Sequence, residues 1–210
     1  MKKTTWVMIG ISALLVSAAI SYLWATAIMD SMYAFRSPLT SAPLPGGAPV
    51  ESRLTRSVVA ILVDGLRVDT AANAEVMPFL NQLRTQGASA VIHSRPPSYS
   101  APAWSVLMIG AWPELSDGPA MNPTEGESIP AWTQDNVFTA IHNLGLKTAF
   151  SGTYYFPQGI PAATLDDSFL VYEETDAADQ ETTAAAINFI QSQEYPFLLV
   201  HLNQVDYAGH

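Results

Sequence analysis

A long uncharged apolar segment opens the chain. From Thr4 to Met29 no residue is charged, and this stretch exceeds the about 20 residues that cross a bilayer as a helix. Lys2 and Lys3 precede it, so the positive-inside bias keeps the N-terminus cytoplasmic and sends the rest of the chain outward. A cleaved signal peptide with a small-residue site at residues 25–27 is the alternative. The length favours an uncleaved anchor in the cell membrane, and the globular part lies on the outer face in either case.

Beyond this segment, apolar runs typical of buried strands alternate with segments of helical periodicity. Strands are expected where apolar, β-branched residues run together, and helices where apolar residues recur every three or four positions. We predict strands at residues 57–63, 88–93, 147–151 and 196–202, and helices at residues 74–86, 102–110, 136–144 and 176–193. Apolar strands that alternate with helices indicate a parallel sheet covered on both faces. The predicted fold class is therefore α/β, a parallel-rich sheet flanked by helices and preceded by a single N-terminal transmembrane helix.

The composition changes between the apolar segment and the first predicted strand. Residues 37–50 are rich in Pro, Gly and Ala and carry no charge, which suits an extended tether. With 210 residues, the chain has room for one domain of moderate size. We therefore expect a membrane anchor at residues 1–30, a tether at 31–56 and a globular domain at 57–210.

Charge and cysteine content exclude some kinds of function. The formal net charge is -10, and no run of Lys or Arg is present, which argues against a nucleic-acid partner. A substrate that contains phosphate stays open, because bound metal ions can reverse the local field. The chain has no cysteine, so any metal ligands must be Asp, His, Glu or hydroxyl oxygens.

Two aspartates directly follow predicted strands. Asp64 comes after the strand at 57–63, and Asp206 comes after the strand at 196–202, four residues before His210. Functional side chains of parallel sheets gather at the carboxyl ends of the strands. An Asp and a His at this spacing can hold one divalent ion from one side. The alternative for each is an ordinary structural role, which for Asp64 is that of a turn residue before glycine.

Ser100 lies at the start of a predicted helix and has two possible roles. Its hydroxyl can cap the helix by accepting a bond from a free amide. It can also act as a nucleophile, because the positive end of a helix favours both an attacking alkoxide and an anionic substrate. A bound metal ion would lower the pKa of this hydroxyl further.

These motifs occur in a recognisable order. VDG follows the first strand at residues 63–65, PSYSAP stands at 97–102 with MIGAWPELSDG behind it at 108–118, and VDYAGH closes the chain at 205–210. The ordered set resembles the alkaline phosphatase superfamily, in its type I phosphodiesterase / nucleotide pyrophosphatase branch. The resemblance covers roughly residues 57–210, which would form the N-terminal part of such a catalytic domain.

The resemblance implies a two-metal mechanism. Members of the superfamily hold two divalent metal ions, usually zinc, between which a Ser or Thr attacks phosphorus. By position, Asp64 and Ser100 would bind one ion, with Ser100 as the nucleophile, and Asp206 and His210 would bind the other. The implied function is that of a membrane-tethered, exported, metal-dependent hydrolase of phosphoric esters. Its substrate would be a small-molecule or lipid-linked phosphoester.

Other functions remain open. The branch often has Asn three residues after the nucleophile, where this chain has Ala103. A sulfatase shares the fold, but the sulfatase pattern C/S-x-P-x-R has Trp104 in place of its arginine here. A transferase that moves a phosphoryl group onto a lipid or glycan uses the same phosphoenzyme. A non-catalytic binding domain, or pseudoenzyme, would keep the fold without a complete site.

Three further residues are expected to have structural roles. His201, inside an apolar strand, is interpreted as a core histidine or as a support behind a ligand, rather than as a ligand. Arg67 and Arg95 are close in sequence to candidate site residues, but ion pairs are favoured for both over contacts with a substrate phosphate.

The resemblance also predicts that a fragment ending at His210 is inactive. The superfamily supplies an Asp-His pair and a final His late in the chain, and without them each metal ion has two side chains from this sequence. We expect that the chain is cut at this point and that the remaining ligands lie beyond it. Purified residues 50–210 should therefore not hydrolyse an aryl phosphodiester, and measurable zinc-dependent turnover would contradict this expectation.

Overall fold

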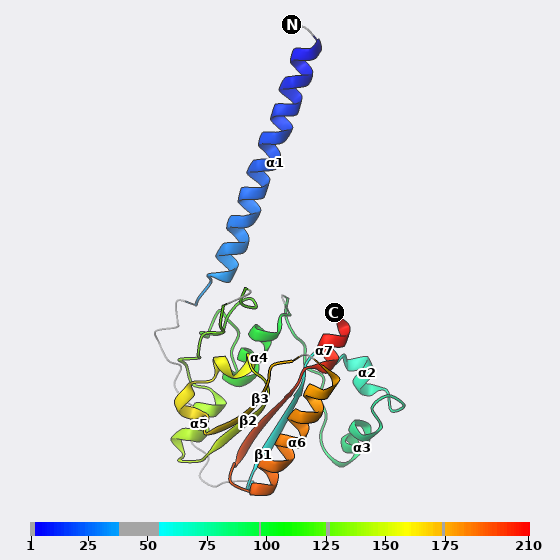
Figure 1. Ribbon diagram of the computed structural model, residues 1–210, viewed down its shortest axis with the longest axis vertical. Helices are drawn as coiled ribbons and strands as arrows, with labels where there is room; N and C mark the ends of the chain where they lie inside the picture. Colours follow the sequence, from blue (N-terminus) through cyan, green and yellow to red (C-terminus); the bar gives the residue numbers. More distant parts are fainter. Residues whose placement is uncertain (1–2, 38–54, 97, 125–126, 174) are drawn as a thin grey trace.

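A computed structural model describes residues 3–37, 55–96, 98–124, 127–173 and 175–210. A helix of 31 residues, α1 (Lys3–Tyr33), projects from a body in which helices surround a four-stranded sheet (Figure 1). No residue of α1 is buried, and the helix is long and apolar enough to cross a membrane. The predicted fold class is confirmed, both for the flanked parallel sheet and for the single apolar helix before it.

All four strands of the sheet run parallel, in the order β1-β4-β2-β3. The strands are β1 (Val58–Val63), β2 (Thr148–Thr153), β3 (Asp167–Val171) and β4 (Phe197–Leu202). β4 is the last strand in the chain but lies between β1 and β2. Because β2 and β4 are covered on both faces, their residues are almost all buried.

Alternate residues of β4 face the two helical layers. Phe197 and Leu199 belong to a core cluster with residues of α4 (Ser100–Ile109) and α5 (Val137–Asn143). Leu198 and Val200 pack instead with α6 (Asp176–Ser192) on the other face. Since side chains alternate along a strand, His201 points toward the α4 face.

The remaining elements are short. They are α2 (Val68–Ala72), α3 (Pro78–Gln86), α7 (Gln204–Gly209) and two single turns of 3₁₀ helix, η1 (Phe156–Gly159) and η2 (Ala162–Thr164). The sequence patterns did not predict β3 or α7. α3 begins at Pro78 rather than at residue 74, because proline is favoured at the first position of a helix and breaks it further in.

The predicted strand at residues 88–93 is wrong. The segment has no regular secondary structure, and Val91 and Ile92 are exposed. Its β-branched residues favour an extended backbone, but a strand also needs a hydrogen-bonded neighbour and a face to bury. The sheet ends at β1 on one side and at β3 on the other, and neither pairs with this segment.

The junction between α1 and the body is only partly described. The Ser37 hydroxyl donates a hydrogen bond to the backbone oxygen of Glu114 at 2.7 Å, which connects the segment after α1 to the body. α1 runs three residues past the predicted anchor, and residues 38–54 of the predicted tether lie outside the described residues. The division into anchor, tether and domain stays a prediction.

The turn after β1 approaches α7 closely at Gly65. Gly65 has φ of 68°, and a Cβ there would lie 2.6 Å from the Cα of Asp206. Gly145 has φ of 70°, but a Cβ there would have no atom within 4 Å, so it provides a control for backbone strain alone. A non-glycine residue with this left-handed backbone costs about 1 to 2 kcal/mol, and both substitutions bear that cost. At residue 65 the new Cβ must also displace α7, which costs a further 1 to 3 kcal/mol, roughly.

We therefore expect Gly65→Ala to lower the free energy of unfolding more than Gly145→Ala does, by about 1 to 3 kcal/mol. Urea denaturation in detergent micelles measures both values. Equal destabilisation by the two variants would show that α7 does not pack against this turn.

Candidate active site

The carboxyl ends of β1 and β4 meet at one edge of the sheet. Val63 pairs with Leu202 in the parallel register, and the Asp64 amide continues the ladder with a 2.9 Å bond to the Leu202 oxygen. α7 begins two residues after β4, and its Asp206 lies against the backbone of Gly65. The structure thus places Asp64 and Asp206 at the ends of neighbouring strands, as the sequence patterns predict.

α4 brings Ser100 to the same edge. Tyr99 is the N-cap of α4 and Ser100 is its first residue, so the interpretation of Ser100 as the cap is wrong. The side chain of Asn122 performs part of that role from a distant segment, because its Oδ1 accepts a 2.9 Å bond from the Ala101 amide. The Ser100 hydroxyl is instead close enough to the Asp64 carboxylate to help lower the pKa of that carboxyl.

The Asp64 carboxylate is held by groups from three elements. Its Oδ2 accepts a 3.1 Å bond from Trp104 Nε1 of α4 and lies 3.4 Å from His201 Nε2 of β4. Its Oδ1 accepts a bond from the Gly65 amide in the adjacent turn at 3.0 Å. The Asp64 side chain is 16% exposed, so most of its surface is in contact with protein.

His201 supports this carboxylate from behind. The imidazole is fully buried, and its Nδ1 lies 2.7 Å from Thr153 Oγ1 at the end of β2. With Nε2–H donated to Asp64, Nδ1 accepts the Thr153 hydroxyl proton, so both ring nitrogens are satisfied. Gly152 lets β2 approach, because a Cβ there would lie 2.7 Å from the His201 Cβ. This arrangement confirms the interpretation of His201 as a buried support.

These contacts lower the pKa of Asp64. Burial by itself raises the pKa, since it penalises the charged form. The His201 imidazole, the Ser100 hydroxyl and the Gly65 amide act in the opposite direction and together outweigh burial. The site therefore favours an ionised Asp64 carboxylate, the form that binds cations.

Asp206 and His210 face each other across one turn of α7. His210 Nε2 lies 3.6 Å from Asp206 Oδ2, and the side chains are 79% and 29% exposed, respectively. The orientation of α7 is fixed from α6, where the Asp179 carboxylate accepts bonds from the amides of Asn203 and Gln204. The two side chains are thus close, with the imidazole mostly in solvent, and their role as metal ligands stays a prediction.

These side chains are of the kinds that bind divalent metal ions, but there are too few of them to complete either site. Carboxylate oxygen and imidazole nitrogen are ordinary zinc ligands, and Asp64 with Ser100 and Asp206 with His210 form two pairs of donors. Among the residues that the structure describes, no three His, Asp or Glu side chains are grouped so as to hold one ion. Zinc commonly has four ligands, so each pair is half of a complete set.

Sequence reasoning missed two of the residues that position Asp64. In the sequence, Trp104 attracts notice only because it stands where the sulfatase pattern has an arginine. Its spacing is also informative, since a residue four positions after Ser100 lies on the same face of α4. Its indole stacks on Tyr155 at 5.6 Å and contacts Phe156 at 4.6 Å between centroids, which fixes the direction of its N–H. Thr153 lies two residues beyond the predicted end of its strand, and no sequence signal pairs it with His201.

Both arginines near the site are engaged in ion pairs, as expected. Arg67 pairs with Asp69 at 2.7 Å, and Arg95 pairs with Glu114 at 2.6 Å while stacking over Trp112 at 4.2 Å. Each guanidinium is thus directed at a carboxylate other than that of Asp64. In the described part of the chain, the predicted site therefore contains no arginine that contacts its carboxylate.

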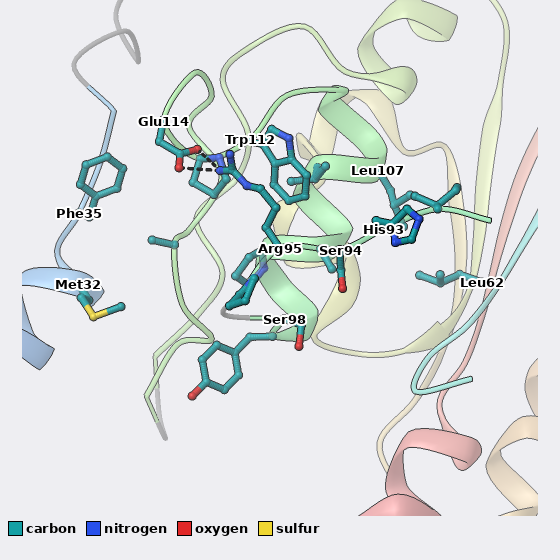
Figure 2. Close-up of a pocket in the computed structure, with 18 of the residues that line it drawn as sticks. Met32, Phe35, Leu62, His93, Ser94, Arg95, Ser98, Leu107, Trp112 and Glu114 are labelled. Carbon is teal, nitrogen blue, oxygen red and sulfur yellow. Dashed lines mark hydrogen bonds and ion pairs between the residues drawn. The ribbon is translucent and has the colours of Figure 1, made fainter. Parts of the chain in front are cut away.

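A cavity of about 810 Å³ lies next to the site, along α4 (Figure 2). Its lining includes Leu62 and Leu66 on either side of Asp64, and Tyr99 and Pro102 on either side of Ser100. Cavities of this size and apolar character are typical of ligand sites.

Comparison with known proteins identifies a family. The family model described as "Type I phosphodiesterase / nucleotide pyrophosphatase" matches residues 58–210, which is most of the chain and the whole of the body beyond α1. No curated protein matches the chain.

The lowered pKa of Asp64 predicts part of the acid sensitivity of the fold. A carboxyl whose pKa is lower in the folded state adds stability above its ordinary pKa, and this stability is lost as the pH falls through the folded value. With a chelator present, the free energy of unfolding should fall more steeply from about pH 5 to about pH 3 in the wild-type chain than in Asp64→Asn. Denaturant titrations at several pH values measure both slopes. Parallel slopes would show that the fold does not favour the ionised form.

Proposed function

Because the chain belongs to the type I phosphodiesterase / nucleotide pyrophosphatase family, we propose that it is a membrane-tethered, exported, metal-dependent phosphoester hydrolase with Ser100 as its nucleophile. The family supports hydrolysis of phosphodiesters in general. The observation that carries the finer proposal is the position of Ser100 at the start of α4, with its hydroxyl close to the ionised Asp64 carboxylate.

Ser100 has the surroundings that a nucleophile of this kind needs. It is the first residue of a helix of ten residues, where the helix dipole favours negative charge on an alkoxide and on a phosphoryl group. Its hydroxyl is not used as a helix cap and is only partly buried. In the proposed reaction, Ser100 Oγ bonds to phosphorus as the ester bond to the leaving alcohol breaks, and the alcohol takes up the hydroxyl proton. Water then cleaves the bond between Ser100 Oγ and phosphorus, which releases the phosphate monoester and restores the hydroxyl.

The contacts of Asp64 orient its carboxylate for a cation. Oδ2 lies against the side chains of Trp104 and His201, whereas Oδ1 lies on the side of the Gly65 amide in the turn after β1. Ligating carboxylates are commonly oriented by hydrogen bonds to their other oxygen. We propose that Asp64 and Ser100 hold one divalent ion and that Asp206 and His210 hold a second, both ions being zinc. Such ions lower the pKa of the hydroxyl and balance the charge of the phosphoryl group.

We propose that α1 anchors the protein in the cell membrane with the body on the outer face. Support comes from the length and exposure of α1 and from Lys2 and Lys3 before it, which favour a cytoplasmic N-terminus. The helix axis of about 46 Å, at 1.5 Å per residue, exceeds the hydrocarbon core of about 30 Å. The excess length places the last turns of α1 outside the hydrocarbon.

A non-catalytic role is the second candidate, and the missing ligands favour it. Each proposed ion has two side chains in the described structure, and no group of three is present there. A binding domain would keep the fold and the Asp64 contacts without needing Ser100 as a nucleophile. The two candidates differ in what happens when the Ser100 hydroxyl is removed.

In the native protein, Ser100→Ala should lower zinc-dependent hydrolysis of an aryl phosphodiester by about 10³-fold or more, because the covalent step is lost. Zinc content, measured by atomic absorption, should change little, since the carboxylate and imidazole ligands remain. Ser57→Ala is the matched control, because this exposed serine stands before β1, at the opposite end of the strand from Asp64, and it should stay within about twofold of wild type.

Undiminished hydrolysis by Ser100→Ala would refute the nucleophile. An aryl sulfate assayed beside the phosphodiester tests the sulfatase alternative, and turnover of sulfate alone would refute the phosphoesterase. Absence of turnover of either substrate by the zinc-loaded native protein would favour the non-catalytic role.

A further inference from the structure

The segment that leads toward Ser100 has few contacts to hold it. Residues 88–96 have no regular secondary structure, and every one of them is exposed. In the described part of the chain, their backbone groups form no hydrogen bond with other backbone groups. Among the same described residues, the hydrogen bonds of this segment are those of the Arg95 side chain. The position of the segment therefore depends mainly on what Arg95 contacts.

Arg95 contacts a carboxylate and an aromatic ring at once. Its Nη2 donates to both carboxylate oxygens of Glu114, at 2.6 and 2.7 Å, and its guanidinium carbon lies 4.2 Å from the centre of the Trp112 ring. Figure 2 shows the side chain extended toward Glu114 and away from Ser98. A guanidinium that pairs with a carboxylate and also stacks on an indole has its direction set by both contacts.

The loop that carries Glu114 is fixed to the body on two sides. The Ser37 hydroxyl donates to the Glu114 backbone oxygen at 2.7 Å. Just after Glu114, Ser116 and Asp117 are buried, and the Asp117 carboxylate accepts hydrogen bonds from the backbone amides of residues 133–134. Glu114 is therefore a firm attachment point for Arg95.

The ion pair connects the two flanks of α4. Arg95 stands five residues before Ser100, the first residue of α4, and Glu114 stands five residues after Ile109, the last. The pair thus closes a loop of chain that contains the whole helix. When the pair opens, the segment before Ser100 loses the hydrogen bonds of Arg95, and the backbone that enters the helix at Ser100 becomes free to shift.

We propose that Arg95 and Glu114 are positioning residues for Ser100, because their ion pair holds the segment that enters α4 at the nucleophile. The inference rests on the proposed function, since it assigns both side chains a part in the reaction of Ser100. Exposed ion pairs add little to stability, so the effect is on the position of the hydroxyl and not on the folding of the domain. A displacement of a reacting atom by about 1 Å can cost about 10²-fold in rate.

A spin label reports whether the ion pair holds this segment. The chain has no native cysteine, so Ser94→Cys can carry a single label next to Arg95. In the 210-residue chain in nanodiscs, the label should move several-fold faster in Arg95→Gln and in Glu114→Gln than without these changes. Arg67→Gln is the matched control, because Arg67 forms another exposed ion pair near the site, with Asp69 at 2.7 Å. It should leave the motion unchanged, and equal motion in all these chains would overturn the proposal.

Turnover by the native protein tests the role in the reaction. Arg95→Gln and Glu114→Gln should each lower kcat for an aryl phosphodiester by about tenfold to hundredfold, with KM within about twofold of wild type. The double variant should be no slower than the slower single variant, since either change already opens the pair. Arg95→Glu combined with Glu114→Arg should restore part of the rate, which a role in packing alone would not predict.

Three kinetic results would overturn the proposal. Losses that add in the double variant would show that the two side chains act separately, and no recovery on exchange of the charges would show that their attraction is not what matters. A raised KM with unchanged kcat in Arg95→Gln would show that Arg95 contacts the substrate instead of positioning Ser100.

The label and the turnover separate this inference from the proposed function. If Ser100-dependent hydrolysis is unchanged in both single variants, the phosphoesterase stands and the positioning role is refuted. If the label moves faster in both variants but the native protein hydrolyses no phosphodiester, the ion pair holds the segment and the proposed reaction is refuted.

Discussion

The parallel pairing of β1 with β4 is the constraint on which the candidate site depends. The register that joins Val63 to Leu202 brings two strand ends together that are more than 130 residues apart in sequence. It also decides which face each side chain of β4 occupies. A slip of one residue would exchange the two faces and would turn His201 away from Asp64 and toward α6. The carboxylate, its supporting imidazole and the start of α7 are therefore positioned by one set of backbone hydrogen bonds.

The polar groups around Asp64 are buried among aromatic rings, and this makes their arrangement rigid. An unpaired polar group in such surroundings costs about 1 to 3 kcal/mol, so Thr153, His201 and Asp64 each stabilise the others. Trp104 contributes its N–H from a ring held between Tyr155, Phe156 and the edge of His201. Because none of these rings can move independently, the Asp64 carboxylate points in a fixed direction. A site organised in this way needs little rearrangement to receive a cation.

The sequence predicted the sheet and the candidate residues better than it predicted their contacts. Long apolar runs such as residues 57–63 and 196–202 identify buried strands, because a parallel sheet covered on both faces needs them. The run at residues 88–93 has similar residues but no neighbouring strand, and a strand depends on pairing that composition does not encode. The ordered motifs led to Asp64, Ser100 and Asp206, which the structure brings to one edge of the sheet. The Thr153–His201 bond and the approach of Gly65 to Asp206 could not be predicted, since both depend on the order of strands in the sheet.

Ala103 connects the departure from the family pattern with the cavity. At this position, three residues after Ser100, the branch often has asparagine, whose amide can bind a phosphoryl oxygen. Here the residue is a small apolar one that forms part of the cavity wall. The wall next to Ser100 therefore offers hydrocarbon surface in place of a hydrogen-bond donor.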